Sequence, residues 1–171
     1  MISKEKGLIA SMALLLASPA FAGEEPGFYV GAGAGSFGVD VGGFSGNDTS
    51  FKVLAGYDFG KYFAAEIEYI DGGSPEDQGI ALDISGTNVA VLGTWPVTEQ
   101  FDLFVKIGMI FWEADVAGFG GDSGDDFSYG VGAGYGFTNH FGVRGEYQRF
   151  EIADTDTVDL FAISAVWLVK P

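Results

Sequence analysis

The segment Phe101–Asp115 carries the clearest alternation of apolar and polar positions in the chain. From Phe101 to Phe111 every odd-numbered residue is apolar, whereas the even-numbered positions include Asp102 and Lys106. A period of two is that of a β-strand whose two faces meet different surroundings. The segment exceeds the usual strand length of about five or six residues and is long enough to cross a bilayer at a tilt. It therefore predicts a long strand with one apolar and one mixed face.

Seven further segments alternate in the same way, and no helical period competes with them. The 28 glycines disfavour helix and fit tight turns and crowded backbone. The eight predicted strands are Gly27–Ser36, Ser50–Phe59, Tyr62–Asp71, Gly86–Trp95, Phe101–Glu113, Phe127–Phe137, Phe141–Glu151 and Thr157–Val169. They predict one all-β domain.

The connections between these strands alternate in length. The short ones are Gly60–Lys61, Pro96–Gln100 and Thr138–His140, and the mostly longer ones are Phe37–Thr49, Gly72–Ser85, Ala114–Asp126 and Ile152–Asp156. Short turns at one end and long loops at the other are typical of outer-membrane barrels. The pattern predicts an eight-stranded antiparallel up-and-down transmembrane β-barrel with short periplasmic turns and longer extracellular loops.

The N-terminal residues have the three parts of a secretory signal peptide. Lys4 and Lys6 are followed by a mostly apolar run, Leu8–Leu16, and by the cleavage pattern Ala20–Ala22. We expect residues 1–22 to be cleaved near Ala22 and residues 23–171 to form the mature barrel domain. No later apolar run reaches the length of a spanning helix, so only a closed barrel could cross a membrane. These features predict a Gram-negative cell-envelope protein of the outer membrane.

Aromatic residues stand at the short-turn end of every predicted strand, on its apolar face. They are Phe28, Phe59, Phe63, Trp95, Phe101, Phe137, Phe141 and Trp167. Such a girdle belongs where an apolar band meets lipid headgroups, so these residues are predicted to lie at the lipid interface. Tyr69, Phe111, Tyr129 and Tyr147 could form a second, looser ring. A soluble barrel of lipocalin type, with its faces reversed, is the alternative that periodicity alone leaves open.

The opposite faces of the strands carry a predicted interior network of charges. Its members are Lys52, Asp58, Glu66, Glu68, Asp102, Lys106, Arg144 and Glu146. An eight-stranded barrel is just wide enough for its own side chains, and buried charges persist when they are paired. The pattern favours structural pairing of these charges, with ion passage as the alternative.

Overall charge excludes one class of partner. The net charge is −16, and nucleic-acid binding depends on Lys and Arg contacts with phosphates. The same charge argues against adhesion to an anionic surface unless cations form bridges. The sequence has no cysteine, so disulfides cannot supply the stability of this exported domain.

Several motifs, in order, resemble the transmembrane domain of OmpA-like proteins and the related small barrels of OmpX type. Gly27–Ala32 resembles the first strand of that family, and Gly56–Tyr57 with Tyr62–Tyr69 resembles the second hairpin. Leu103–Asp115 resembles the fifth strand and Arg144–Gln148 the seventh. The resemblance covers nearly all of residues 23–171.

The resemblance implies a barrel that holds charged pairs inside. By position, Glu66 and Arg144 match one acid–base pair of the family, and Lys106 and Glu146 match further interior charges. A second pair would fall at Leu92 and Gly134, where both charges are missing. A charge-swapping gate is therefore not expected to carry over intact.

Catalysis and cofactors have little support in the sequence. His140, the single histidine, is predicted in a short periplasmic turn with no acid or nucleophile aimed at it. We expect no enzyme and no catalytic residue. Asp122, Asp125 and Asp126 in a predicted loop are weak candidates for a divalent cation, because hard cations prefer oxygen ligands. No other cofactor is expected.

Three classes of function remain open from the sequence. The first is an integral outer-membrane protein with a structural or surface-interaction role, displaying acidic loops on a narrow packed barrel. The second is a porin-like channel for ions or small solutes, and the third a soluble binding barrel. For the first class we expect outer-membrane lipid, lipopolysaccharide and the barrel-assembly machinery as partners, the last through Trp167. We expect a monomer and no nucleic-acid partner.

Overall fold

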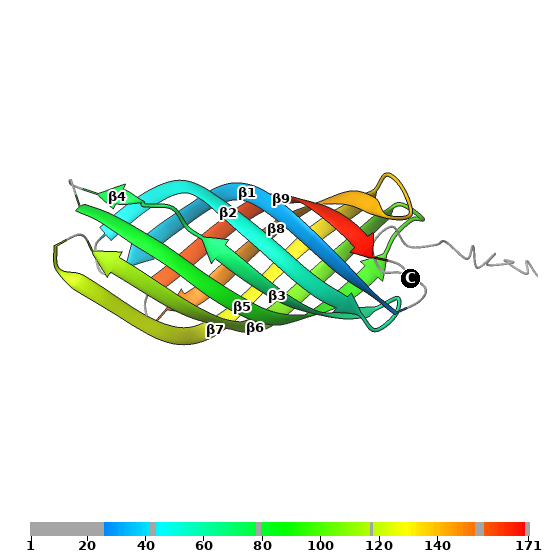
Figure 1. The fold of residues 1–171 in the computed structure, drawn as a ribbon, viewed down its shortest axis with the longest axis horizontal. Helices are drawn as coiled ribbons and strands as arrows, with labels where there is room; N and C mark the ends of the chain where they lie inside the picture. The colour runs from blue at the N-terminus through cyan, green and yellow to red at the C-terminus, as the bar shows by residue number, and fades with distance from the viewer. Residues whose placement is uncertain (1–25, 42–43, 78–79, 117, 153–155, 170–171) are drawn as a thin grey trace, which may run out of the picture.

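The chain forms a closed antiparallel β-barrel with strongly tilted strands (Figure 1). The structure is a computed structural model that describes residues 26–41, 44–77, 80–116, 118–152 and 156–169. The predicted signal peptide lies outside these residues. No helix in the described ranges is long and apolar enough to cross a membrane.

The strands are long, and most contain 12 to 17 residues. Their bounds are β1 Gly27–Val41, β2 Phe44–Asp58, β3 Phe63–Asp71, β4 Glu76–Asp77, β5 Ile80–Pro96, β6 Phe101–Val116, β7 Gly120–Gly136, β8 Phe141–Ile152 and β9 Asp156–Val169. Eight of these strands form the barrel wall, which confirms the predicted fold class. The two-residue strand β4 pairs only with the outer end of β5.

Closure of the barrel comes from the pairing of its first and last strands, β1 and β9. β1 pairs with β9 along thirteen positions from Phe28↔Val169 to Asp40↔Thr157. β3 pairs with β5, where Glu66 lies opposite Ala90. All other wall strands pair with their sequence neighbours. Every central strand edge is thus hydrogen-bonded, as a structure that crosses lipid requires.

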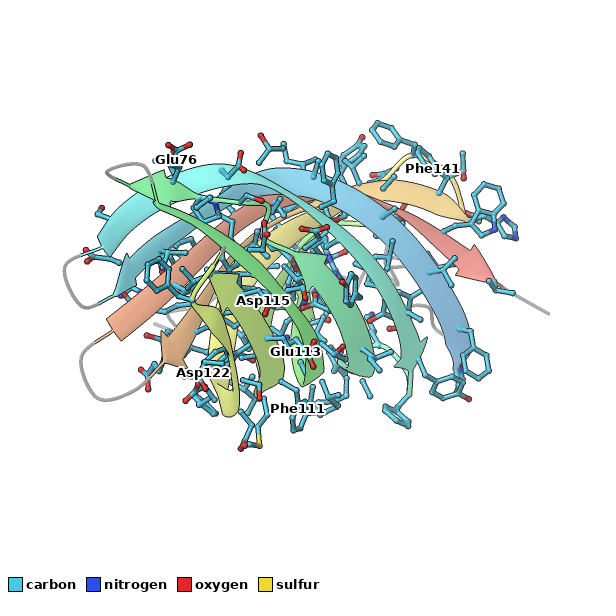
Figure 2. The ribbon with its side chains drawn as sticks, turned by 60° about the vertical axis from the view of Figure 1, so that its left-hand side comes forward. Glu76, Phe111, Glu113, Asp115, Asp122 and Phe141 are labelled. Atoms are coloured by element: carbon cyan, nitrogen blue, oxygen red, sulfur yellow. The ribbon has the colours of Figure 1, made fainter. Side chains whose placement is uncertain are left out.

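Side chains alternate between the inside and the outside of the wall along each strand. On β6, Phe104, Lys106 and Ile110 are buried, while Leu103 and Ile107 are about half exposed. The same alternation continues to the outer end of the strand, where Glu113 and Asp115 are exposed and Trp112 and Ala114 are partly buried (both acids are labelled in Figure 2). The period of two therefore assigns inner and outer faces correctly.

The strands extend farther toward the outside than the sequence predicts. Most of Phe37–Thr49, Gly72–Ser85 and Ala114–Asp126, which we expected to be loops, lies in β1, β2, β4, β5, β6 and β7. The ladder between β1 and β2 continues to Val41↔Phe44, and that between β6 and β7 to Val116↔Gly120. The predicted loop lengths are wrong here, because pairing satisfies backbone groups even where Gly, Asp and Ser dominate the composition.

Candidate functional site: a charge layer inside the barrel

Three layers of side chains fill the barrel from the short turns to the outer mouth. The turn-side core consists of Tyr29, Leu54, Ala64, Leu92, Phe104, Val166 and Leu168. The charge layer, in the middle, consists of Lys52, Glu66, Glu68, Lys106, Arg144 and Glu146. The mouth-side core consists of Phe37, Val39, Ile70, Ile84, Ile110, Phe150, Val158, Leu160 and Ala162. The sequence alternation places each set inside, and the register of the strands stacks them.

Glu66 lies at the turn-side edge of the charge layer and contacts two cations, Arg144 and Lys106. Arg144 donates to both of its oxygens, with Nη1–Oε2 at 2.8 Å and Nη2–Oε1 at 3.0 Å. Lys106 donates to Oε1 at 2.6 Å, and the Tyr29 hydroxyl donates to Oε2 at 2.8 Å. Two-point contact between guanidinium and carboxylate is the strongest common ion-pair geometry. The resemblance-based pairing of Glu66 with Arg144 corresponds to this contact.

Glu68 is completely surrounded by donors. Lys52 contacts Oε1 at 2.8 Å and Lys106 contacts the same oxygen. Asn88 and Gln148 donate to Oε2 at 3.0 and 2.9 Å. Both carboxylate oxygens are therefore satisfied, which is the condition under which a buried charge is tolerated.

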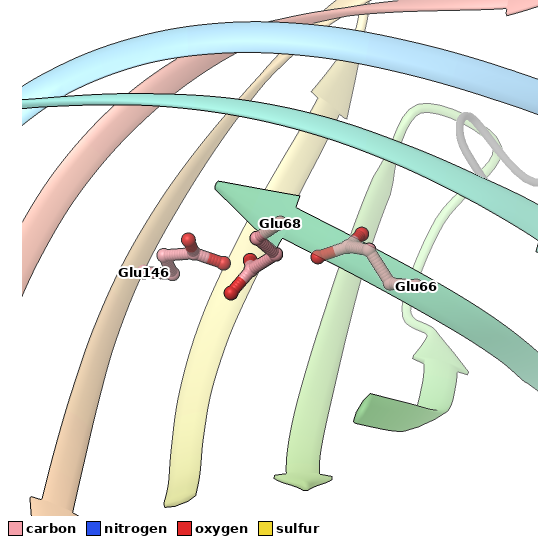
Figure 3. Close-up of side chains that lie close together, drawn as sticks. All are labelled: Glu66, Glu68 and Glu146. Carbon is pink, nitrogen blue, oxygen red and sulfur yellow. The ribbon is translucent and has the colours of Figure 1, made fainter. Parts of the chain in front are cut away.

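Glu146 completes the layer from the opposite side of the barrel. It contacts Lys106 at 3.1 Å, Arg144 at 3.5 Å and also Lys52. Figure 3 shows the three glutamates converging, Glu66 and Glu68 from β3 and Glu146 from β8. Three acids face three cations, so the layer is formally neutral although all six side chains are buried.

The three glutamates also form the one group of potential metal ligands among the described residues, with oxygens within 4.8 Å of one another. Their oxygens already accept hydrogen bonds from Lys106, Lys52 and Arg144. A divalent cation would have to displace these ammonium and guanidinium groups. The arrangement is thus a network of ion pairs rather than a metal centre.

The remaining two members of the predicted interior network lie closer to the short turns. Asp58 and Asp102 are buried and line a cavity of about 30 Å³ together with Tyr29 and Arg144. That volume admits a water molecule or two but no larger solute. A second cavity, of about 10 Å³, lies in the mouth-side core. The structure thus brings six of the eight predicted charges into one layer and leaves two beside it.

The predicted interface aromatics all lie on the outer surface at the short-turn end. Phe28, Phe63 and Trp95 are among the most exposed apolar side chains of the described residues, at 65, 69 and 75%. The full set of eight is described, and Phe101 is the member with partial burial. Tyr69, Phe111 and Tyr147 lie outside on the other end of an exposed apolar belt that includes Val105 and Ile107. We call the whole exposed apolar surface, from the turn-side aromatics through Val105 and Ile107 to Tyr69, Phe111 and Tyr147, the lipid belt.

Beyond the lipid belt, the outer surface becomes polar and contains an exposed ion pair. Arg149 Nε lies 2.7 Å from Asp159 Oδ1, and the Tyr147 hydroxyl donates to the same oxygen. The hydrogen bond from Arg149 holds the pKa of the Asp159 carboxyl below its usual range. This pair therefore stabilises the fold above the ordinary pKa of an aspartate and stops doing so as the pH falls through the lowered value.

The predicted cation candidates do not share a face. Asp122 and Asp126 have the inward register of β7, whereas Asp125 has the outward register. Asp126 accepts a hydrogen bond from Trp112 Nε1 at 2.6 Å, and Asp122 accepts one from the backbone N–H of Ser123. Strand pairing therefore places Asp125 on the opposite face of β7 from Asp122 and Asp126.

Sequence reasoning placed Gln148 on the inner face but missed three other neutral members of the network, Asn88, Ser128 and Tyr29. Asn88 donates to Glu68 and accepts from Ser128 Oγ at 2.7 Å, and all three side chains are buried. The signal was available, because Val89 and Val91 belong to the apolar face of their strand and Asn88 must then point inward. Tyr29 follows the outward aromatic residue Phe28, and its inward hydroxyl contact with Glu66 was not predicted.

Comparison with known proteins places this architecture in a family. Residues 8–167 match the family model for the outer membrane protein beta-barrel domain. The chain therefore belongs to the outer-membrane β-barrel family, and it is an integral protein of the cell outer membrane.

A curated relative and two solved structures agree with this assignment. The chain is 28% identical over 117 residues to Outer membrane protein A of Yersinia pseudotuberculosis, covering 60% of this chain and 33% of that protein. The chain thus matches about a third of the length of that relative. Neisserial surface protein A has a TM-score of 0.67 at 16% identity, covering 84% of this chain and 99% of the other. Ail of Yersinia pestis, in complex with the heparin analogue sucrose octasulfate, has a TM-score of 0.62 at 17% identity, covering 85 and 99%. At these identities the two structures show the fold alone.

Proposed function

We propose that this protein is a closed barrel with a structural and surface-interaction role, which anchors an acidic outer end in the outer membrane. The observation that carries the proposal is the charge layer. Six paired side chains from β2, β3, β6 and β8 bridge the lumen at its middle. Each of its cations contacts at least two acids, so the layer acts as a cross-brace between strands that are not neighbours.

The channel alternative conflicts with how the lumen is filled. Apolar cores lie on both sides of the charge layer, and two cavities lined by inward side chains of the described residues have volumes of about 30 and 10 Å³. An ion that crossed the barrel would have to separate Arg144 from Glu66 and then pass buried Phe150. Breaking a buried pair costs about 3–5 kcal/mol before any desolvation of the ion is counted.

We expect the protein to show no discrete conductance steps in planar lipid bilayers at 1 M KCl. A general porin reconstituted in the same bilayers serves as the positive control for insertion and recording. The Glu66→Gln variant is recorded in parallel, because it removes one charge from the layer without changing its shape. Regular unitary steps from the wild-type protein whose size changes in Glu66→Gln would contradict the closed-barrel proposal.

The outer end of the barrel is acidic, which favours cationic surface partners. Exposed acids beyond the lipid belt include Asp71, Asp83, Glu113, Asp115, Asp125 and Glu151, whereas Arg149 is already paired with Asp159. Such a surface favours cationic partners and opposes polyanions of the kind seen with Ail. Contact with the phosphates of lipopolysaccharide would need bridging divalent cations.

The absence of an enzymatic role remains part of the proposal. His140 is exposed in the turn between β7 and β8, where its ring lies 6.0 Å from that of Trp167. Within the described residues His140 forms no ion pair with an acid. We also propose a monomeric state, because the barrel leaves no wall strand unpaired for a second copy. Insertion by the barrel-assembly machinery is a further part of the proposal.

A further inference from the structure

The outer mouth of the barrel contains a cavity that the packing of the barrel does not require. Its volume is about 510 Å³, and its apolar lining includes Val39, Ile84, Trp112, Ala114, Phe119 and Val158. This size lies within the range of about 300–1,000 Å³ that is typical of small-molecule sites. The cavity lies beyond the lipid belt and is open to water, so its apolar walls are not covered by lipid. Phe119, in the turn between β6 and β7, is 88% exposed.

Trp112 forms the most specific part of this wall. It has the inward register of β6 and packs against the mouth-side core below. Asp126 accepts a hydrogen bond from its indole N–H at 2.6 Å, which fixes the orientation of the ring. Gly124 faces the ring, and a Cβ atom there would lie 3.0 Å from it. A large aromatic surface is therefore held in place in the wall of the cavity.

The charges around the cavity all have one sign. Asp122 is the ionisable residue in its lining, and Asp126 lies behind Trp112. Asp48 does not line the cavity but has inward register on β2, and hydrogen bonds from the backbone N–H groups of Ser74 and Thr49 lower the pKa of its carboxyl. Among the described residues the cations of inward register, Lys52, Lys106 and Arg144, are all consumed in the charge layer below the mouth-side core.

We propose that the mouth cavity binds small cationic amphiphiles, each with an aromatic or short alkyl body and one ammonium or guanidinium head. The body fits the apolar wall formed by Val39, Ile84 and Val158. The head is attracted by the carboxylate of Asp122 and by the face of Trp112, since aromatic faces attract cations. The cavity lies in the mouth alone, so binding there does not depend on the proposal that the lumen is closed.

Trp112 itself can report on binding. The protein contains three tryptophans, and Trp95→Phe with Trp167→Phe leaves Trp112 as the single emitter. The variant is reconstituted in phosphatidylcholine nanodiscs and titrated with benzyltrimethylammonium or with phenylmethanesulfonate, which has a similar shape and the opposite charge. We expect saturable change of Trp112 emission, with half-saturation by the cation at a concentration about tenfold lower than by the anion, a ratio that corresponds to about 1.4 kcal/mol.

Two substitutions that each remove one negative charge distinguish binding in the cavity from attraction of the cation by the net charge of the protein. Asp122→Asn is expected to weaken binding of benzyltrimethylammonium about threefold to fivefold, as for a solvent-accessible ion pair. Glu113→Gln removes the same charge from the outer face of β6 and should leave the affinity unchanged. Ala114→Phe should abolish the response by filling the cavity, with heat-modifiable gel migration as the check that the barrel is folded.

Three results would overturn the proposal. They are an unsaturable emission change, equal affinity for the two probes, and equal effects of Asp122→Asn and Glu113→Gln. The last outcome would mean that overall negative charge concentrates the cation near the protein without a site.

Discussion

Glu66→Ala is expected to lower the free energy of unfolding by about 3–5 kcal/mol, because it breaks a buried network from one side. Glu66 accepts two hydrogen bonds from Arg144 and one each from Lys106 and Tyr29. Its removal changes the formal charge of the layer from zero to plus one. The cations cannot reach water, since their side chains are at most 6% exposed.

The measurement is urea unfolding of the protein in lipid vesicles, followed by tryptophan emission and by heat-modifiable migration. Glu66→Gln keeps the shape and should give an intermediate loss. Arg149→Ala is the matched control, because it breaks a single pair with Asp159 that is more than a third exposed. Exposed pairs contribute about 0–1 kcal/mol. Equal losses in Glu66→Ala and Arg149→Ala would contradict the role assigned to the charge layer.

Ile107→Arg is expected to destabilise the barrel in vesicles by about 2–4 kcal/mol, because it places a charge in the lipid belt near the middle of the bilayer. Ile107 lies between Val105 and Met109 on the outer face of β6, and all three are about half exposed in the protein alone. Asp115→Arg is on the same strand and the same face but beyond the belt. It should cost about 0–1 kcal/mol.

The comparison of these two arginines separates a membrane barrel from a soluble one. If the outer face of β6 met water, both substitutions would be close to neutral, since exposed charges are then solvated. A loss that depends on depth is specific to lipid. Equal effects at Ile107 and Asp115 would contradict the assignment of the outer face.

The sequence predicts the membrane-crossing half of this barrel better than its outer half. Strands such as Phe101–Glu113 have an apolar face set by lipid, so their alternation is unmistakable. Beyond the belt both faces become polar or small, and segments such as Gly120–Asp126 read as loops although they pair as strands. Phe37 and Val39 could have indicated that the strand continues, because these apolar residues are two positions apart. In the structure both point inward and pack in the mouth-side core.

Which interior charges meet depends on the stagger of the strands. Alternation places Lys52, Glu68 and Glu146 inside, but their contacts join β2, β3 and β8. The hydrogen-bond register around a closed barrel fixes these contacts. The pairing of Glu66 with Arg144 was expected only from a family resemblance, and no pattern within the sequence distinguishes it from other pairings; the two-point geometry comes from the structure. The apolar mouth cavity was missed because its lining comes from β1, β5, β6, β7 and β9.

The most direct test of the whole account is the labelling of single cysteines in intact cells with a membrane-impermeant maleimide. The natural sequence contains no cysteine, so Phe119→Cys, Ile107→Cys and Thr138→Cys each introduce a unique thiol. We expect labelling at position 119, at the outer mouth, and none at position 107 in the lipid belt. Position 138, in the turn between β7 and β8, should be labelled only after the outer membrane is permeabilised. Equal labelling of positions 119 and 138 in intact cells, or strong labelling at 107, would contradict a closed barrel that crosses the outer membrane in this orientation.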